Sequence, residues 1–275
     1  MSRPFLKMNG LGNDFVVVDA RTAPFDPSQI EVRKICDRTS GVGCDQLVSL
    51  ERSTKGDARV RFWNADGEEV GACGNASRCV GWLLMEGAGT DAAVLDTRGG
   101  LLRAARAGDH RVSVDMGEPR LAWDQIPLAE EMDTKGIELQ VGPIDAPILH
   151  TPGCVSMGNP HVVFFVPDAE AAPVREVGPM IEHHYLFPEG VNVGFAQVKA
   201  RDHIRLKVWE RGAGLTKACG TGACAALVAC ARRGLTDRKA TLELDGGDLV
   251  IEWRESDGHV IMTGPLEIEF TGELP

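Results

Sequence analysis

The sequence predicts an α/β fold in which strands dominate, built as two similar lobes with one central helix in each. Three observations lead to this prediction. The chain repeats itself at a fixed offset, its extended runs outnumber its helical patterns, and each copy contains one segment with the pattern of a helix. We therefore interpret the chain as an ancient duplication.

The repeat is carried by four stretches that align without a gap. Ala72-Cys73-Gly74-Asn75 resembles Ala218-Cys219-Gly220-Thr221, an offset of 146 residues. At the same offset, three further stretches fall on one another: Gly12-Asn13 on Gly158-Asn159, Gln46 on Asn192, and 59–64 on 205–210. We place the first lobe at residues 1–118 and the second at 119–264. Four prolines and several acidic residues between Gly117 and Pro147 indicate a connecting region.

Extended segments are predicted wherever β-branched or alternating apolar residues run together. In chain order these segments are Asp14–Asp19, Ala58–Trp63, Arg111–Asp115, Val162–Val166, Val193–Lys199, His203–Trp209, Thr241–Leu244, Leu249–Trp253 and Val260–Thr263. Gly246-Gly247, which separates two of them, predicts a hairpin turn.

Two equivalent segments have the pattern of a helix. One runs from Gly74 towards Met85 and ends near Gly87; the other runs from Gly220 to Arg233 and ends at Gly234. Residues 223–230 of the second segment leave no polar face. A helix that is apolar all round is buried, so we expect sheet around it.

Composition narrows the class of function. The 275 residues hold 29 Lys+Arg against 40 Asp+Glu, a formal net charge of −11, which argues against nucleic acid or an anionic membrane as the main partner. No apolar run is long enough to span a membrane, and the first residues show no signal peptide. We expect a cytoplasmic protein.

Eight cysteines raise the question of disulfides or zinc. Disulfide frameworks belong to short secreted chains, and the close cysteine pairs here lack histidines at ligand spacing, so we expect no metal. Cys73 and Cys219 differ from the other six because each precedes a glycine and the first turn of its lobe's central helix. Unpaired backbone N–H groups at that place should lower the pKa of a thiol and bind a carboxylate.

Two such thiols on opposite sides of one ligand could remove a proton from one face of a carbon and deliver another to the opposite face. This two-base chemistry inverts a stereocentre. Two thiols close to one centre would share one proton in a coupled titration.

Several stretches resemble the diaminopimelate epimerase family over nearly the whole chain. They are KMNGLGNDFVVVD, GCDQ, FWNADGEEVGACGN, SMGNPHVVFFV, VNVGF and WERGAGLTKACGTGACAA. The resemblance implies two pseudo-symmetric lobes, each a mostly antiparallel sheet wrapped around a central helix, with residues 265–275 returning to the first lobe. It also implies a homodimer without cofactor that interconverts L,L- and meso-2,6-diaminopimelate in lysine and peptidoglycan precursor biosynthesis.

The resemblance also implies roles for individual residues. Cys73 and Cys219 would be the acid/base pair, with His161 and Glu210 supporting catalysis. The substrate-binding residues would be Asn13, Gln46, Asn64, Gly74, Asn75, Asn159, Asn192, Glu210, Arg211, Gly220 and Thr221. Of these, Arg211 offers a bidentate fork for the distal carboxylate of the substrate. The family often has glycine at Ala76 and serine at Thr221, and we expect little effect from either departure.

Other interpretations remain open at this point. A racemase of the same group that acts on proline or hydroxyproline would not need Arg211. A thiol sensor or metal-binding module would use Cys73 and Cys219 without catalysis. Residues 220–225 superficially match a dinucleotide-binding fingerprint, but they lack the acidic residue and the full βαβ unit.

Overall fold

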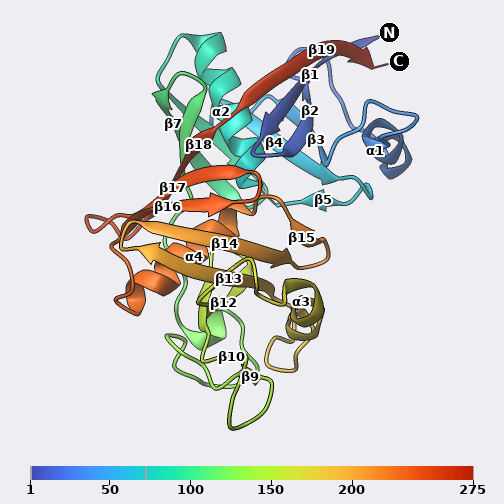
Figure 1. Ribbon diagram of the computed structural model, residues 1–275. Helices are drawn as coiled ribbons and strands as arrows, with labels where there is room; N and C mark the ends of the chain where they lie inside the picture. The colour runs from blue at the N-terminus through green and yellow to red at the C-terminus, as the bar shows by residue number, and fades with distance from the viewer. Residues whose placement is uncertain (1, 72, 275) are drawn as a thin grey trace. The chain divides into compact units, whose positions relative to one another are not determined.

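Hydrogen-bonded strands outnumber helices in the computed structural model, which describes residues 2–71 and 73–274 (Figure 1). The chain divides into two units, Met1–Asp115 together with Thr263–Pro275, and Met116–Met262. The structure confirms the predicted α/β class with strands dominating. Ala72, which opens the first copy of the repeated motif, lies outside the described residues.

The first unit holds more residues in strands than in its two helices. Its elements are β1 (Arg3–Gly10), β2 (Asn13–Asp19), α1 (Gln29–Cys36), β3 (Gln46–Glu51), β4 (Ala58–Asn64), β5 (Glu69–Val70), α2 (Gly74–Ala88), β6 (Ala92–Thr97), β7 (Gly100–Gly108), β8 (Arg111–Asp115) and β19 (Glu267–Leu274). The last strand, β19, pairs antiparallel with β1 (Figure 1).

The second unit repeats this plan. Its elements are a short 3-10 turn (Trp123–Gln125), β9 (Gln140–Val141), β10 (Leu149–His150), β11 (Gly153–Ser156), β12 (Pro160–Phe165), α3 (Val174–Glu182), β13 (Asn192–Ala200), β14 (His203–Glu210), β15 (Gly214–Thr216), α4 (Gly220–Arg232), β16 (Lys239–Leu244) and β17 (Gly247–Trp253). Strand β18 (Val260–Pro265) contains the residues at which the chain returns to the first unit.

Strand pairing follows the same order in both units. In the first unit β1–β2, β3–β4 and β6–β7 are antiparallel, whereas β2–β3 and β4–β6 are parallel. In the second unit β11–β12, β13–β14 and β16–β17 are antiparallel, whereas β12–β13 and β14–β16 are parallel. The strand pairing within each unit is therefore mostly antiparallel.

The registers of the central strand pairs, β2–β3 with β12–β13 and β3–β4 with β13–β14, repeat with the offset found in the sequence. Phe15 pairs with Gln46 across β2–β3, and His161 pairs with Asn192 across β12–β13. Each of these pairs differs from its counterpart by 146 residues at both members, so equivalent side chains occupy equivalent places in the two sheets.

The two central helices begin where the sequence predicts, at Gly74 and Gly220. Nearly every residue of α4 from Gly220 to Cys230 is buried, which confirms the helix with no polar face. Within their own units, α2 packs on strands β1, β2, β6, β7 and β8, and α4 packs on β11 to β14, β16 and β17. The helix expected to end near Gly87 continues to Ala88, because Gly89 is the residue that adopts the left-handed cap.

The segment between Gly117 and Pro147, which the prolines indicated as a connection, is instead part of the second unit. Its buried residues Ile126, Leu128, Ile137 and Leu139 join the hydrophobic core of that unit. Apolar side chains spaced between the prolines therefore outweigh the turn signals. Among the described residues, no helix is both long enough and apolar enough to cross a membrane.

Candidate active site

The predicted site residues all lie at strand ends or helix starts. Asn13, Gln46 and Asn192 are the first residues of β2, β3 and β13, while Asn64 and Glu210 are the last residues of β4 and β14. Strands β2 and β3 run parallel, and β4 runs antiparallel to β3. The first residues of β2 and β3 and the last residue of β4 therefore lie at the same end of these strands.

In the first unit, the thiol of Cys73 lies at the start of α2. Cys73 is the N-cap of this helix and is half-buried, and Gly74 and Asn75 form the first helical positions. The Cys73 Sγ is 3.8 Å from Asn13 Oδ1, and Asn75 Nδ2 donates to the same oxygen at 3.4 Å. The structure thus brings together three residues that are up to 62 positions apart in the sequence.

Gln46 and Asn64 form a second pair in the first unit. Gln46 Nε2 donates to Asn64 Oδ1 at 2.8 Å, as expected from their direct pairing across β3–β4. Gln46 Oε1 is buried and has no hydrogen-bond partner. A buried amide oxygen without a partner is costly, so it is available to accept a hydrogen bond from a ligand.

In the second unit, Cys219 is the N-cap of α4, and it is 3% exposed. Its Sγ accepts a hydrogen bond from the Gly222 backbone N–H at 3.3 Å and lies 3.7 Å from Thr221 Oγ1. Glu210, at the end of β14, also hydrogen-bonds this thiol and is bonded by the Thr216 hydroxyl.

The pKa of Cys219 is raised well above its ordinary value, first by burial and then by the carboxyl group of Glu210. The Gly222 N–H and the Thr221 hydroxyl lower it, but they do not compensate. The expectation that a helix start by itself lowers the thiol pKa is therefore wrong for Cys219, because desolvation penalises the thiolate more than one N–H group stabilises it. Burial also raises the pKa of Glu210.

His161 and Asn159 connect the strand β12 to the start of α4. The buried ring of His161 has its Nε2 3.1 Å from Asn159 Oδ1, and Asn159 Nδ2 donates to Thr221 Oγ1 at 3.3 Å. Burial, with a smaller effect of the Arg211 charge, lowers the pKa of His161 to about 3. His161 is consequently neutral at physiological pH and acts there as a hydrogen-bonding group.

Asn192 and Arg211 are held to each other through the backbone. Asn192 Oδ1 accepts from the Arg211 N–H at 3.0 Å, and Asn192 Nδ2 donates to the Pro160 carbonyl at 2.9 Å. The exposed Arg211 guanidinium donates to the Glu189 carbonyl at 2.7 Å. A Cβ at Gly190 would lie 3.0 Å from Arg211 Cδ, so this glycine makes room for the arginine stem.

Two charged residues beside the first thiol were missed by the sequence reasoning. Asp45 accepts a hydrogen bond from Asn13 Nδ2 at 2.9 Å, and the fully buried Arg78 donates to Asn75 Oδ1 at 3.0 Å. A signal for Arg78 was available, since an arginine inside an otherwise apolar helix is unusual. The other six cysteines are buried, as expected for packing residues: Cys36, Cys44, Cys79, Cys154, Cys224 and Cys230.

Solved structures show that this fold occurs in a wider group of proteins. The chain is similar to a phenazine biosynthesis protein of the PhzF family from Bacillus anthracis, with a TM-score of 0.70 and 15% identity over 100% of this chain and 99% of that one. It is also similar to a hydroxyproline epimerase from Agrobacterium vitis, with a TM-score of 0.69 and 15% identity over 99% of this chain and 91% of that one.

Sequence comparison identifies the family within this group. The model of the family described as diaminopimelate epimerase matches residues 5–122 and 153–269. A diaminopimelate epimerase of Phenylobacterium zucineum is 67% identical over 100% of this chain and 99% of its own length. One from Rhodospirillum centenum is 55% identical over 100% of this chain and 93% of its own. The chain belongs to the diaminopimelate epimerase family.

Proposed function

We propose that this protein interconverts L,L- and meso-2,6-diaminopimelate by a two-base proton transfer at one α-carbon, with Cys73 and Cys219 as the acid/base pair. The observation that carries the proposal is the position of these two thiols at equivalent helix starts, in two units whose strand pairs β2–β3 and β12–β13 have the same register. The family membership and the 67% identical relative support the choice of substrate.

Each helix start supplies donors for a carboxylate. The first backbone N–H groups of α2 and α4 have no partner within their helices, and the helix dipole is positive at this end. We assign Gly74-Asn75 and Gly220-Thr221 to the carboxylate of the reacting centre. Hydrogen bonds to this carboxylate stabilise the negative charge that develops when the α-proton leaves.

The protonation states in the second unit give Cys219 the role of proton donor in the resting enzyme. Its raised pKa keeps the thiol protonated at neutral pH, and the Glu210 carboxyl group beside it can accept or return that proton. We assign the neutral His161 imidazole a supporting role through its hydrogen bond to Asn159, which in turn contacts Thr221 at the start of α4. In the reverse direction the roles of the two thiols exchange.

The remaining polar residues distinguish the substrate. We assign Asn13, Gln46, Asn64, Asn159, Asn192 and Arg211 to the ammonium and carboxylate groups, mostly those of the unreacting end. The buried acceptor Gln46 Oε1 fits an ammonium group, and Arg211 fits the distal carboxylate that lysine lacks. We further propose that the enzyme acts as a cytoplasmic homodimer, without a metal or pyridoxal phosphate, and without nucleic acid as a partner.

Deuterium exchange tests this function directly. Metal-free, reduced protein is incubated with L,L-diaminopimelate in D2O, and deuterium at the α-carbon is followed together with formation of the meso isomer; proline is the control substrate. We expect exchange with diaminopimelate only. Protein that is folded and reduced but exchanges no deuterium would rule out the proposal.

Three substitutions test the assigned roles in the same assay. Cys73→Ala and Cys219→Ala should each abolish epimerisation, and near wild-type turnover by either variant would refute the two-base scheme. Arg211→Met should abolish turnover of diaminopimelate; if it does not, the assignment of Arg211 to the distal carboxylate is wrong.

A further inference from the structure

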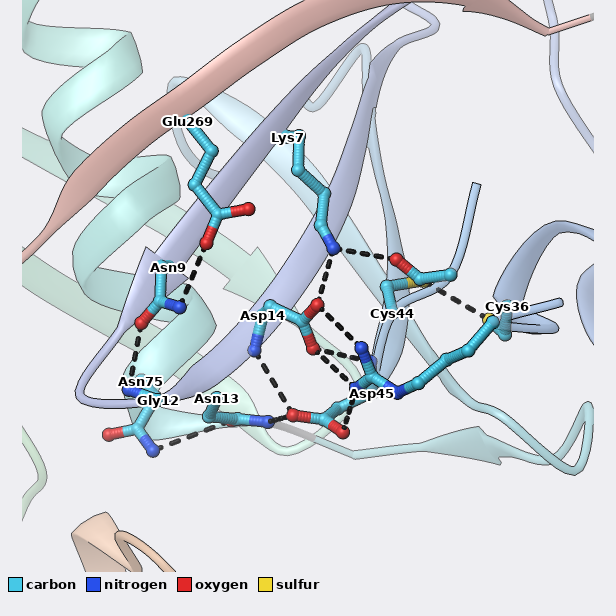
Figure 2. A network of polar contacts seen from close by, with 12 residues as sticks. Lys7, Asn9, Gly12, Asn13, Asp14, Cys36, Cys44, Asp45, Asn75 and Glu269 are labelled. Carbon is cyan, nitrogen blue, oxygen red and sulfur yellow. Dashed lines mark hydrogen bonds and ion pairs between the residues drawn. The ribbon is translucent and has the colours of Figure 1, made fainter. Parts of the chain in front are cut away.

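Two asparagine side chains beside Cys73 lie in a row between a carboxylate and a guanidinium group. Asp45 Oδ2 accepts from Asn13 Nδ2 at 2.9 Å, Asn13 Oδ1 accepts from Asn75 Nδ2 at 3.4 Å, and Asn75 Oδ1 accepts from Arg78 at 3.0 Å. Figure 2 shows the part of this row from Asp45 through Asn13 to Asn75. We call these four residues the amide row.

The charges at the two ends dictate which way each amide points. A carboxylate can only accept hydrogen bonds, so the group of Asn13 that faces Asp45 must be its NH2. A guanidinium can only donate, so the group of Asn75 that faces Arg78 must be its oxygen. Both ends thus require the same orientation of the row, with the Asn13 oxygen directed to the Asn75 NH2 and to the Cys73 sulfur, which is 3.8 Å away.

The carboxylate end is itself held in place by a network of ion pairs. Arg38 binds Asp45 at 2.7 Å and binds both oxygens of Asp14, while the backbone N–H of Asp45 donates to Asp14 at 3.0 Å. The buried Lys7 also pairs with Asp14 (Figure 2). These partners hold the pKa of Asp14 well below its usual range, so Asp14 stays ionised at physiological pH.

The guanidinium end is fixed by burial. Arg78 has no exposed surface, and its Nε donates to the Pro265 carbonyl at 3.3 Å. A Cβ at Gly10 would lie 3.2 Å from Arg78 Nη2, so the neighbouring strand β1 passes close to the guanidinium. Arg78 therefore has little freedom to release Asn75.

The second unit lacks both charged ends. At the offset of 146 residues, Asp45 and Arg78 correspond to Val191 and Cys224, which are both buried. Asn159, the counterpart of Asn13, directs its oxygen to His161 and its NH2 to the Thr221 hydroxyl. Equivalent asparagines are thus oriented in opposite senses: Asn13 presents an acceptor towards its helix start, and Asn159 presents a donor.

We propose that Asp45 and Arg78 are positioning residues of the first unit: they orient Asn13 and Asn75 so that an acceptor oxygen faces the Cys73 thiol and an ammonium group of the substrate. This inference rests on the proposed function for the identity of the ammonium group. An acceptor at this place binds the substrate cation and the S–H form of Cys73, which is the form of this thiol after it has removed the α-proton, whereas an NH2 group there would repel the cation and favour the thiolate.

Substitution of Asp45 tests the proposal, because its side chain is 41% exposed and its removal leaves no large cavity. Asp45→Ala removes both acceptor oxygens, and Asp45→Asn retains one. The matched control is Asp19→Ala, which removes a carboxylate of 46% exposure at the other end of β2. Two quantities are measured for each protein: kcat/KM for L,L-diaminopimelate, and the pH midpoint of Cys73 alkylation by iodoacetamide, followed by peptide mass spectrometry.

We expect kcat/KM to fall about 10- to 100-fold in Asp45→Ala, the range set by loss of a hydrogen bond to a charged group, and less in Asp45→Asn. The alkylation midpoint should move to lower pH, because Asn13 can then turn its NH2 to the sulfur. Asp19→Ala should change neither quantity. The buried thiol of Cys79, whose pKa burial raises to about 12, should stay unmodified and so report that α2 remains folded.

Two results would overturn the inference. One is an Asp45→Ala variant that matches the wild type in both kcat/KM and alkylation midpoint. The other is joint alkylation of Cys73 and Cys79, which would mean that Asp45 only maintains the local fold. Failure of the proposed function is a separate outcome, since it would appear in the wild-type protein as absence of deuterium exchange, whereas the alkylation midpoint is measured without turnover.

Discussion

The side chains around Cys219 show that burial and position at a helix start have opposite effects on the pKa of a thiol. Cys219 has the N-cap position and the Gly222 N–H that favour a thiolate, yet its pKa is raised because the thiol is buried beside Glu210. The repeat in the sequence singled out Cys219, and the family resemblance its neighbours, as candidate site residues. Their protonation states could not be predicted, because burial depends on packing between segments that are distant in sequence.

The carboxyl group of Glu210 provides a prediction at this scale. Glu210→Gln removes a negative charge next to Cys219, so the pKa of Cys219 should fall and its alkylation should begin at lower pH. Turnover should nevertheless decrease about 100-fold or more, because the amide cannot take up the proton of the thiol. Alkylation of Cys219 across pH and kcat for epimerisation measure the two effects.

The comparison for this prediction is Glu243→Gln, which alters a surface carboxylate of the same unit that pairs with Lys199. This variant should match the wild type in both measurements. If Glu210→Gln left the alkylation profile of Cys219 where it is in the wild type, the carboxyl group would not be acting on the thiol.

At the scale of elements, the local sequence pattern predicted the segments in which either all residues or every second residue is buried. The apolar helix α4 and strands such as β8 were predicted because all or alternate residues are buried. Helix α3 was missed because Pro179 lies inside it. Strand β7 was missed because its residues LLRAARAG are typical of a helix, and only the antiparallel partners β6 and β8 make it a strand.

The first turn of α4 provides a prediction that separates helix stability from positioning of the thiol. A Cβ at Gly222 would lie 3.1 Å from the Cys219 Sγ and 3.2 Å from Val208 Cγ2. Gly222→Ala should therefore displace the sulfur and lower kcat/KM at least tenfold, since small misplacements of a reacting group have large effects on rate. Kinetics and thermal unfolding are measured on the same samples.

The matched variant is Gly87→Ala near the end of α2, where nothing lies within 4 Å of the added Cβ. It should leave kcat/KM unchanged and increase the free energy of unfolding by about 0.5–1 kcal/mol, the usual difference between glycine and alanine inside a helix. A Gly222→Ala enzyme with normal kcat/KM would show that the contact at Cys219 is easily relieved.

At the scale of the whole molecule, the duplication explains why so much of the candidate site could be predicted. Because the registers of the central strands repeat with the sequence offset, a residue recognised on these strands in one unit identifies its partner in the other, as with Gln46 and Asn192. The charged residues Asp45 and Arg78 have no such partner, since Val191 and Cys224 stand at the equivalent positions. The repeat therefore predicts what the two units share and misses what distinguishes them.

The last strand, β19, completes the first unit through contacts with β1 that the local sequence pattern does not predict. Gly272 of β19 pairs with Phe5 of β1, and a Cβ at this glycine would lie 2.6 Å from the Phe5 ring. Phe5 belongs to the core of the unit, so Gly272→Val should force its ring out of place and lower the stability by about 1–3 kcal/mol. We expect a lower melting temperature and faster amide exchange in β1, whereas Thr271→Val, at an exposed neighbouring position, should change neither. Unaltered exchange in β1 of the Gly272→Val protein would mean that β19 does not stabilise this strand, because the predicted clash acts directly at their shared register.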